Sequence, residues 1–416
     1  MGVKGLTALL ARYAPACISM PEAKDIAGWT VAVDSNIFVQ RFFRGTAGGA
    51  AQGNRHTQGM RGLAEYARSL GITPVFVFDG EERAKGKENE LQKRRELKSR
   101  LRDELNAEQA RALRIAAMAR VSALLLDDVP ATGTRHDAVE PFADRQQAVE
   151  WLERNAAQLA RDAGARAARR ETADSRMSGL EHAVCQLLLF QLGATAALAG
   201  GVDAQQQQQC SLQTLQRLNT ERLDMLRRRT ESLTPAHVDA CRRAVAALGF
   251  ATHTAQGHES EAVCAALVRQ GVADATCSED LDVLAFGGRR LLRGFYAPSA
   301  AELMLIDADR AHADLGLTRG AFVDLCILCG TDFSATLEGV GPVTALRLVR
   351  RFGSIERIVD ANPALRPRPG FCFQDARAIF LQDIASPFLC RAQVAPRRPL
   401  IPPSPSFDPF ASPPKQ

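Results

Sequence analysis

The sequence predicts an α/β fold, in which a mostly parallel sheet carries helices on both faces. Two observations lead to this class. Short apolar runs rich in β-branched residues alternate along the chain with longer amphipathic stretches, which is the pattern of strand–helix–strand units. The clearest of these runs also end in aspartate, and polar side chains that follow parallel strands gather at one edge of a sheet.

Three strands are predicted in chain order. The run WTVAVDSN ends its apolar part at Asp34, and TPVFVFDG begins beside Pro74 and ends at Asp79. A weaker run, VADATCSED, ends near Asp280. These three runs supply the predicted core of the sheet.

Helices are predicted between the strands. The stretches MRGLAEYARSLG, HVDACRRAVAALG and SEAVCAALVRQG have apolar residues at helical spacing, and they stop at Gly71, Gly249 and Gly271. Glycine just past the last periodic residue is a common C-terminal signal of a helix.

Seven carboxylates can converge on the carboxyl edge of this sheet. Most lie at or after the predicted strands, one follows the apolar run DLCILCG, and a glutamate pair begins a predicted helix, where the helix dipole favours acids. Taken singly, each is typical of a cap or a turn. The seven are Asp34, Asp79, Glu259, Glu261, Asp280, Asp282 and Asp332.

Seven acids at one edge would need cations, because carboxylates are costly to bury and repel one another when close. Ligands that offer only oxygen suit Mg²⁺ or Mn²⁺. Two such ions about 3.5–4 Å apart activate a water and stabilise the leaving oxygen in phosphodiester hydrolysis. The acids therefore predict a two-metal site.

A lysine cluster stands out in an arginine-rich chain. Only 7 of the 52 basic residues are lysines, and four of those fall between residues 85 and 98. The segment 85–102 is either a solvated helix face or a surface that binds phosphate. Its basic residues are Lys85, Lys87, Lys93, Arg94, Arg95, Lys98, Arg100 and Arg102.

The sequence GVGP at residues 339–342 stands directly before the amphipathic stretch VTALRLVRRF. Glycines at a helix N-terminus expose backbone N–H groups that suit phosphate. Many loops contain G-x-G, so the signal gains weight only beside the clustered acids.

The chain is predicted to divide into the regions 1–102, 103–225, 226–360 and 361–416. Residues 103–225 are rich in Ala, Arg, Leu and Gln, with a glutamine run at 205–209, and are predicted to be partly helical and partly disordered. The end of the last region is proline-rich and is predicted to be unfolded.

Membrane and secreted classes are not expected. No apolar run reaches the about 18 residues of a membrane span, and MGVKGLTALL is too short and too polar for a secretory signal. Cys326 and Cys329 have the spacing of zinc ligands, but no second ligand pair stands at a suitable distance. They are predicted to be buried thiols in a reduced, intracellular chain.

A set of seven motifs resembles, in order and spacing, the structure-specific 5′ nucleases of the XPG/Rad2-type superfamily, and among these most nearly the flap endonucleases. The resemblance covers roughly residues 1–102 and 217–360. It implies a PIN-like nuclease core, a helical arch or cap with a long insertion, and a helix–two-turn–helix DNA-binding element. The motifs are MGVKGLTALL, VAVDSN, PVFVFDGEE, HESEAVCAALV, SEDLDVLAFG, DLCILCGTDF and LEGVGPVTALRLV.

The resemblance also implies a role for each matching residue. One metal site would use Asp34, Asp79, Glu259 and Glu261, and the other Asp280, Asp282 and Asp332. Lys87 and Arg94 would contact the scissile phosphate. DNA contacts would come from Gly2, Gly330, Gly339, Gly341 and Arg44. A K⁺ ion would bind at the helix–two-turn–helix, and Gly2 would lie near the active site once Met1 is removed.

The chain departs from the family pattern in three ways. The aromatic residue that stacks on the terminal base is replaced by Gln40, so Phe38, Phe42 or Phe43 would have to substitute. The spacer between Asp79 and Glu259 is longer than in a flap endonuclease and more like that of the excision-repair nuclease. No clear sliding-clamp peptide is present in the tail.

The expected function is a Mg²⁺-dependent endonuclease, with Mn²⁺ as a substitute, that cleaves branched DNA of the 5′-flap type. The resemblance also implies 5′ exonuclease activity, a role in DNA replication and repair in the nucleus, and a monomer that a sliding clamp could recruit. Two alternatives stay open. One is an excision-repair or junction-resolving nuclease of the same superfamily. The other is an inactive nucleic-acid-binding scaffold, which a missing metal ligand would signal.

Overall fold

The computed structural model describes residues 2–45, 54–80, 88–125, 145–166, 173–193, 202–296 and 303–384. The chain forms two units. The first comprises Met1–Arg94 and Ser232–Gln416, and the second comprises Arg95–Glu231. No helix in these ranges is both long and apolar enough to cross a bilayer.

The first unit is built on a seven-stranded sheet with the order β1-β7-β6-β5-β2-β3-β4. The five strands from β6 to β4 run parallel, whereas β7 pairs antiparallel with both β6 and β1. The predicted mostly parallel sheet is therefore confirmed. The strands are β1 (Ile18–Ser19), β2 (Thr30–Asp34), β3 (Thr73–Asp79), β4 (Ala251–Ala255), β5 (Ala275–Cys277), β6 (Arg290–Arg293) and β7 (Met304–Asp307).

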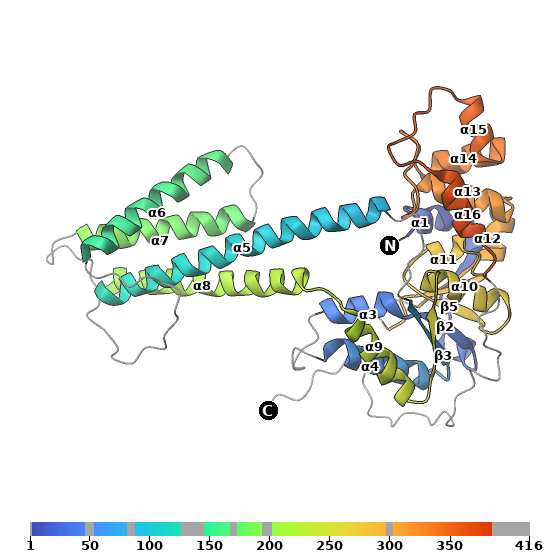
Figure 1. Cartoon of the computed structure of the whole chain (residues 1–416), viewed down its shortest axis with the longest axis horizontal. Helices are drawn as coiled ribbons and strands as arrows, with labels where there is room; N and C mark the ends of the chain where they lie inside the picture. The colour runs from blue at the N-terminus through green and yellow to red at the C-terminus, as the bar shows by residue number, and fades with distance from the viewer. Residues whose placement is uncertain are drawn as a thin grey trace. The chain divides into compact units, whose positions relative to one another are not determined.

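Helices cover both faces of this sheet because β2 and β3 are apolar on both sides (Figure 1). Phe76 and Phe78 of β3 face one core with α3 (Ser35–Arg44), α4 (Arg55–Ser69) and α9 (Pro235–Ala247). Val75 and Val77, the alternate residues of β3, face a second core with α10 (Ser260–Arg269). Alternation along a strand sends neighbouring side chains to opposite faces.

A third core joins the N-terminal helix to the C-terminal helices. Leu6 and Leu10 of α1 (Leu6–Tyr13) are buried with Phe322 of α13 (Arg319–Cys329) and Leu346 of α14 (Pro342–Phe352). Phe380 of α16 belongs to the same core, so the part of region 361–416 up to residue 384 packs within the first unit. The other helices here are α11 (Asp282–Ala285), α12 (Ala308–Leu315), α15 (Ile355–Ala361) and α16 (Phe373–Leu381).

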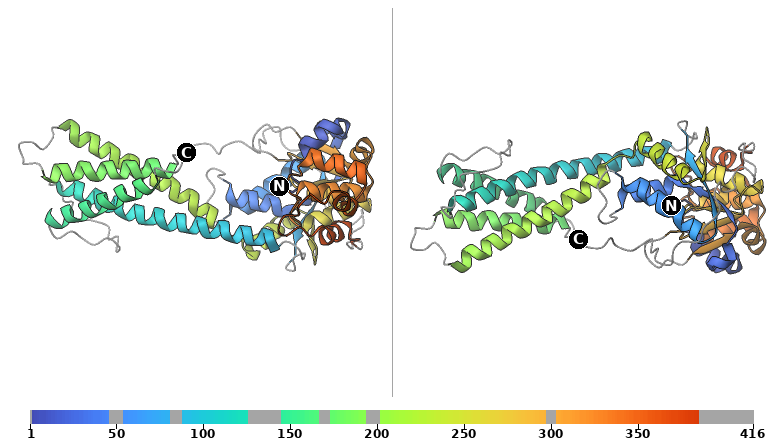
Figure 2. Two further views of the ribbon diagram at one scale, coloured as in Figure 1. Left: turned by 90° about the horizontal axis from the view of Figure 1, so that it is seen from above. Right: turned by 90° about the horizontal axis from the view of Figure 1, so that it is seen from below.

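The second unit consists of long helices that lie side by side (Figure 2). They are α5 (Glu88–Leu125, which begins in the first unit), α6 (Arg145–Arg166), α7 (Ala173–Gly193) and α8 (Val202–Thr230). Met118, Leu152, Leu188 and Leu215 come from the four different helices and are fully buried together. Every described residue of region 103–225 is helical, including the glutamine run.

Polar side chains are also buried inside this second unit. Glu181 is 0% exposed and accepts hydrogen bonds from Arg111 at 3.1 Å and from Arg114. Arg111 also pairs with Glu108, which accepts from Asn219 at 2.8 Å. The network joins α5, α7 and α8, and a buried charge needs such partners to be tolerated.

Candidate metal centre

The carboxyl edge of the parallel strands carries the predicted acids. Asp34 is the last residue of β2 and precedes α3, and Asp79 is the last residue of the neighbouring strand β3. Asp34 is 1% exposed, whereas Asp79 is exposed. Both positions agree with the prediction from the sequence.

Two buried serines hold the Asp34 carboxylate. Ser260 Oγ donates to Oδ1 and Ser278 Oγ donates to Oδ2, each at 2.8 Å. The Ser260 backbone N–H also donates to Asp79 at 3.0 Å, and the Asp280 N–H donates to Ser278 Oγ at 3.0 Å. The sequence analysis missed both serines, although each stands within two residues of a predicted ligand.

The electrostatics of Asp34 reflect burial among like charges. The pKa of Asp34 is raised to about 7, mainly by burial and to a smaller extent by the neighbouring Asp79 and Asp280, while hydrogen bonds from Ser260 and Ser278 act to lower it. An acid in such a place is stabilised by a proton or by a cation.

The glutamate pair lies at the start of α10, as the sequence predicts. Glu259 is the N-cap residue and Glu261 is in the first turn. Both are half-buried. The hydrogen bonds of Ser260, which stands between them, place this helix start beside Asp34 and Asp79.

The second aspartate pair follows β5. Asp280 and Asp282 are 6% and 3% exposed, and the Asp282 N–H donates to Asp280 Oδ1 at 2.9 Å. Gly2 lies directly against this pair, since a Cβ atom on Gly2 would stand 1.9 Å from Asp280 Oδ1. Gly2 also has a φ of 80°. The structure therefore brings Gly2 to the predicted site.

Asp332 follows α13, two residues beyond Gly330. The apolar run before it is a helix, α13, and not a strand. Gly330 ends this helix with a φ of 107°, and its carbonyl accepts from the Lys4 N–H at 3.2 Å. The N-terminal segment, residues 2–5, thus contacts both the Asp280 loop and the Gly330 loop.

The acids share an edge but do not form a finished ligand group. Within the described ranges, no three Asp, Glu, His or Cys side chains stand close enough together to hold one metal ion. Because carboxylates repel one another, we expect them to draw together around a cation. A donor set of carboxylate oxygens suits a hard divalent ion, so the residues fit the predicted Mg²⁺ or Mn²⁺ by their chemistry.

Burial also settles the state of two neighbouring thiols. Burial, and then the charge of Asp34, raise the pKa of the Cys264 thiol well above its ordinary value. Burial, and then the charge of Glu279, raise the pKa of the Cys277 thiol in the same way. A raised pKa favours the neutral thiol, whereas thiolate is the form that ligates metals. Cys326 and Cys329, on α13, are likewise buried.

The GVGP segment leads into α14, as predicted, and its two glycines have different backbone conformations. Gly339 has a φ of 72°, whereas Gly341, the N-cap residue, has a φ of −99°. Gly339 is therefore the position in this segment that requires glycine. Pro342 packs on the N-terminal segment, because a Cβ atom on Gly5 would lie 2.7 Å from its ring.

The remaining predicted contacts are only partly described. Lys87 and the side chain of Arg94 lie outside the described residues, and the backbone of Arg94 is in α5. Arg44 is exposed in the last turn of α3. Arg95, Arg100 and Arg102 are exposed on α5.

The proposed substitutes for the stacking aromatic are mostly buried. Phe38 is 1% exposed and Phe43 7%, so neither is able to stack on a base. Phe42 is half-buried and packs edge-on against Tyr296, with ring centroids 5.8 Å apart. Gln40 is half-buried.

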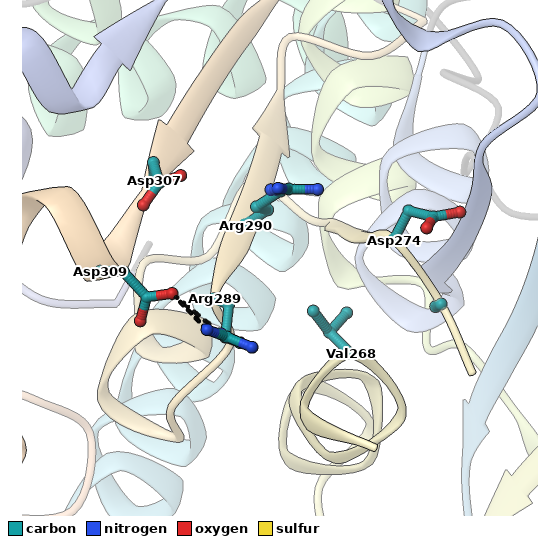
Figure 3. A pocket seen from close by; sticks show the side chains of 7 residues that line it. Val268, Asp274, Arg289, Arg290, Asp307 and Asp309 are labelled. Carbon is teal, nitrogen blue, oxygen red and sulfur yellow. Dashed lines mark hydrogen bonds and ion pairs between the residues drawn. The ribbon is translucent and has the colours of Figure 1, made fainter. Parts of the chain in front are cut away.

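A cavity of about 190 Å³ lies at the opposite edge of the sheet (Figure 3). Asp274 precedes β5, Arg290 begins β6 and Asp307 ends the antiparallel β7, so all three are remote from the acidic edge. Arg289 and Asp309, which line the cavity, form an ion pair of 2.8 Å on the surface. The cavity is separate from the candidate metal centre.

Comparison with known proteins finds two family regions in the chain. Residues 1–101 match the XPG N-terminal domain, and residues 249–332 match the XPG I-region. All seven predicted metal ligands fall inside these two regions.

Similar proteins include flap endonuclease 1 of Xiphophorus maculatus, 37% identical over 166 residues, or 39% of this chain and 43% of that protein. Flap endonuclease 1 of Micromonas commoda is 26% identical over 392 residues, or 91% of this chain and 74% of that protein. The match to the first of these spans less than half of its length. The solved flap endonuclease-1 from Methanococcus jannaschii superposes with a TM-score of 0.45 and 17% identity, covering 87% of this chain and 81% of that one.

Proposed function

The chain belongs to the XPG/Rad2-type nuclease family, whose N-terminal and internal regions it carries, and on this premise we propose that it is a divalent-metal-dependent, structure-specific endonuclease. In this proposal it hydrolyses phosphodiester bonds in branched DNA of the 5′-flap type and has 5′ exonuclease activity. It acts as a monomer in DNA replication and repair in the nucleus, where a sliding clamp is a possible partner.

The observation that supports this function best is the shared edge of Asp34, Asp79 and Asp280. Two of these acids come from the N-terminal region and the third from the internal region. Serine hydrogen bonds of 2.8–3.0 Å connect all three. A fold that brings acids from both family regions to one edge favours metal-dependent phosphodiester chemistry.

In the proposed mechanism the chain holds the cations, the scissile phosphate and the duplex. Divalent ions held by the predicted acids would supply the activation of a water and the stabilisation of the leaving oxygen. The chain's first ligand set is Asp34, Asp79, Glu259 and Glu261, and its second is Asp280, Asp282 and Asp332. Lys87 and Arg94 contact the scissile phosphate. The exposed backbone at Gly339 and Gly341, before α14, faces duplex phosphate together with K⁺.

A second candidate is the excision-repair or junction-resolving nuclease of the same superfamily. The observation that favours it is the second unit, Arg95–Glu231, which inserts a helical body with its own core between the two family regions. Cleavage of flap, bubble and four-way-junction DNAs in Mg²⁺ distinguishes the two candidates. Preference for the bubble or the junction would favour the second.

Asp280→Ala tests the proposed function directly. We expect it to abolish Mg²⁺-dependent cleavage and to leave DNA affinity nearly unchanged, because affinity comes mainly from phosphate contacts elsewhere. Asp309→Ala, which removes an exposed aspartate at the opposite edge, is the matched control and should cleave like the parent. Cleavage by Asp280→Ala at the parent rate would contradict the proposal, and a parent that binds branched DNA without cleaving it would indicate the inactive scaffold.

A further inference from the structure

Two buried hydroxyls fix the plane of the Asp34 carboxylate. Ser260 is 2% exposed and Ser278 is 0% exposed. They donate to different oxygens of Asp34, each at 2.8 Å. The carboxylate cannot rotate about its Cβ–Cγ bond without breaking one of these bonds, so the pair sets which directions its remaining lone pairs face.

Each serine also attaches a second acidic segment to Asp34. The Ser260 N–H donates to Asp79 Oδ1 at 3.0 Å, and Ser278 Oγ accepts from the Asp280 N–H at 3.0 Å. These two serines therefore help to set the positions of Asp79 and Asp280 relative to Asp34. They come from α10 and from the loop after β5, which flank β2 in the fold.

The ordinary role of a serine at a helix start does not account for Ser260. Such a serine normally caps the helix with its hydroxyl. Here Glu259 is the N-cap residue and Ser260 is the first helical residue, with its hydroxyl directed to Asp34. The serine hydroxyl thus hydrogen-bonds to the Asp34 carboxylate and does not cap the helix.

We propose that Ser260 and Ser278 are positioning residues of the metal centre, which orient Asp34 and raise the affinity of the centre for a divalent cation. The inference rests on the proposed function, because the cation is the one proposed there. Groups that hydrogen-bond to metal ligands typically change metal affinity about 10- to 100-fold when they are removed.

Mn²⁺ binding to the full-length protein tests the proposal, with calorimetry or the electron paramagnetic resonance signal of free Mn²⁺ as the measurement. Ser260→Ala and Ser278→Ala should each raise the Kd for Mn²⁺ about 10- to 100-fold. In the double variant the Kd for Mn²⁺ should rise by less than the product of the two single fold-changes, because releasing one oxygen already frees the carboxylate to rotate. Ser35→Ala is the matched control, because Ser35 is 0% exposed and donates to the Val33 carbonyl, and its Kd should equal that of the parent.

Thermal unfolding of the metal-free variants separates positioning from stability alone. Lower Tm values with an unchanged Kd for Mn²⁺ would overturn the proposal. If either alanine variant does not fold, Ser260→Cys and Ser278→Cys keep the volume with a weaker donor and should still weaken Mn²⁺ binding; an unchanged Kd overturns the proposal. A parent protein that binds no Mn²⁺ contradicts the proposed function instead.

Discussion

At the scale of single residues, Asp34 shows how the fold creates a demand for a cation. Its carboxylate is buried beside Asp79 and Asp280, and its pKa rises to about 7. In the unfolded chain the same group has an ordinary pKa, so the folded metal-free protein binds a proton there more tightly. A divalent ion would satisfy the same demand at neutral pH.

The pH dependence of stability should reveal this. The folded pKa of Asp34 is the higher one, so its contribution to the free energy of unfolding is fully present below the unfolded pKa and is lost as the pH rises through about 7. The decline should be about 1.4 kcal/mol per pH unit between the two values. Asp34→Asn removes the titrating group. The free energy of unfolding of this variant, relative to that of the parent, should therefore increase from about pH 5 to about pH 8.

Urea unfolding in EDTA measures this difference. The chain has 2 tryptophans, of which Trp29 packs against the core beneath α3 and α4, and Trp151 against the core of the second unit. A Trp151→Phe background therefore reports on the first unit alone. A constant difference between Asp34→Asn and the parent at both pH values would show that Asp34 titrates normally.

The two glycines of GVGP should respond differently to valine. Gly339→Val places a β-branched residue at a φ of 72°, a conformation that is strained by about 1–2 kcal/mol, so it should lower the Tm. Gly341→Val has an extended backbone and no atom within 4 Å of the new Cβ, so the Tm should hold. Gly341→Val should instead bind flap DNA more weakly. Its binding should also depend less on salt, because fewer phosphate contacts release fewer counterions. Equal Tm losses in the two variants would contradict this assignment.

At the scale of elements, one arginine connects three of the C-terminal helices. Arg377 of α16 makes two hydrogen bonds to Asp324 of α13, at 2.7 and 2.8 Å, and two to Glu356 of α15, at 2.6 and 2.9 Å. Asp324 is 2% exposed and also accepts from the Ile355 N–H. Arg377 lowers the pKa of Glu356 to about 2. Two of these helices, α13 and α15, pack against α14, which carries the proposed duplex contact.

Arg377→Ala should destabilise the first unit by on the order of 3 kcal/mol, because it leaves a buried carboxylate without its cation. Arg289→Ala breaks the exposed pair with Asp309 and should cost less than about 1 kcal/mol. Adding Asp324→Asn to Arg377→Ala should restore part of the loss, since the uncompensated charge is gone. Urea unfolding followed by Trp29 fluorescence is the measurement, and similar losses for both arginines would contradict the argument.

At the scale of the whole molecule, each unit contains its own core. The sheet cores and the C-terminal core draw only on the first unit, and the second unit buries apolar residues from α5 to α8. A core that is complete within a unit is the condition for that unit to survive without the other.

Two deletions test this independence. Replacing residues 95–231 with a flexible linker should give a soluble protein with the parent Kd for Mn²⁺ and an altered preference among branched DNAs. Removing only residues 121–216 should give an aggregating protein, because it exposes Ile115 and Met118 of α5 after their partners on α6 and α7 are lost. Sedimentation and Mn²⁺ binding provide the readouts. If the shorter deletion stays soluble and binds Mn²⁺ while the longer one aggregates, the two units do not fold independently.

The sequence predicted the central elements well because burial on both faces leaves a continuous apolar run. This holds for β2 and β3 and for the acids that end them. It could not predict β4, whose residues ATHTA are mostly half-buried, or the two-residue β1, whose pairing with β7 is set by tertiary contact. Gly339 and Gly341 look alike in a sequence, and only the path of the loop decides which one takes a positive φ. A serine near an acid is common at caps and turns, so the roles of Ser260 and Ser278 emerged only from geometry.

The N-terminal segment has a consequence for how the protein is made. Residues 2–5 rest on the loops at Asp280, Gly330 and Pro342. A ribosome adds about 5–20 residues each second, so residues 2–5 must wait for the much later loops at Asp280, Gly330 and Pro342 before they find their partners. Asp34 and Asp79 are synthesised early, but the serines that hold them come after the whole second unit. A chain that stops before Ser278 therefore has no complete metal centre, and translation itself delays the assembly of the acidic edge until the second unit and the residues after it have been synthesised.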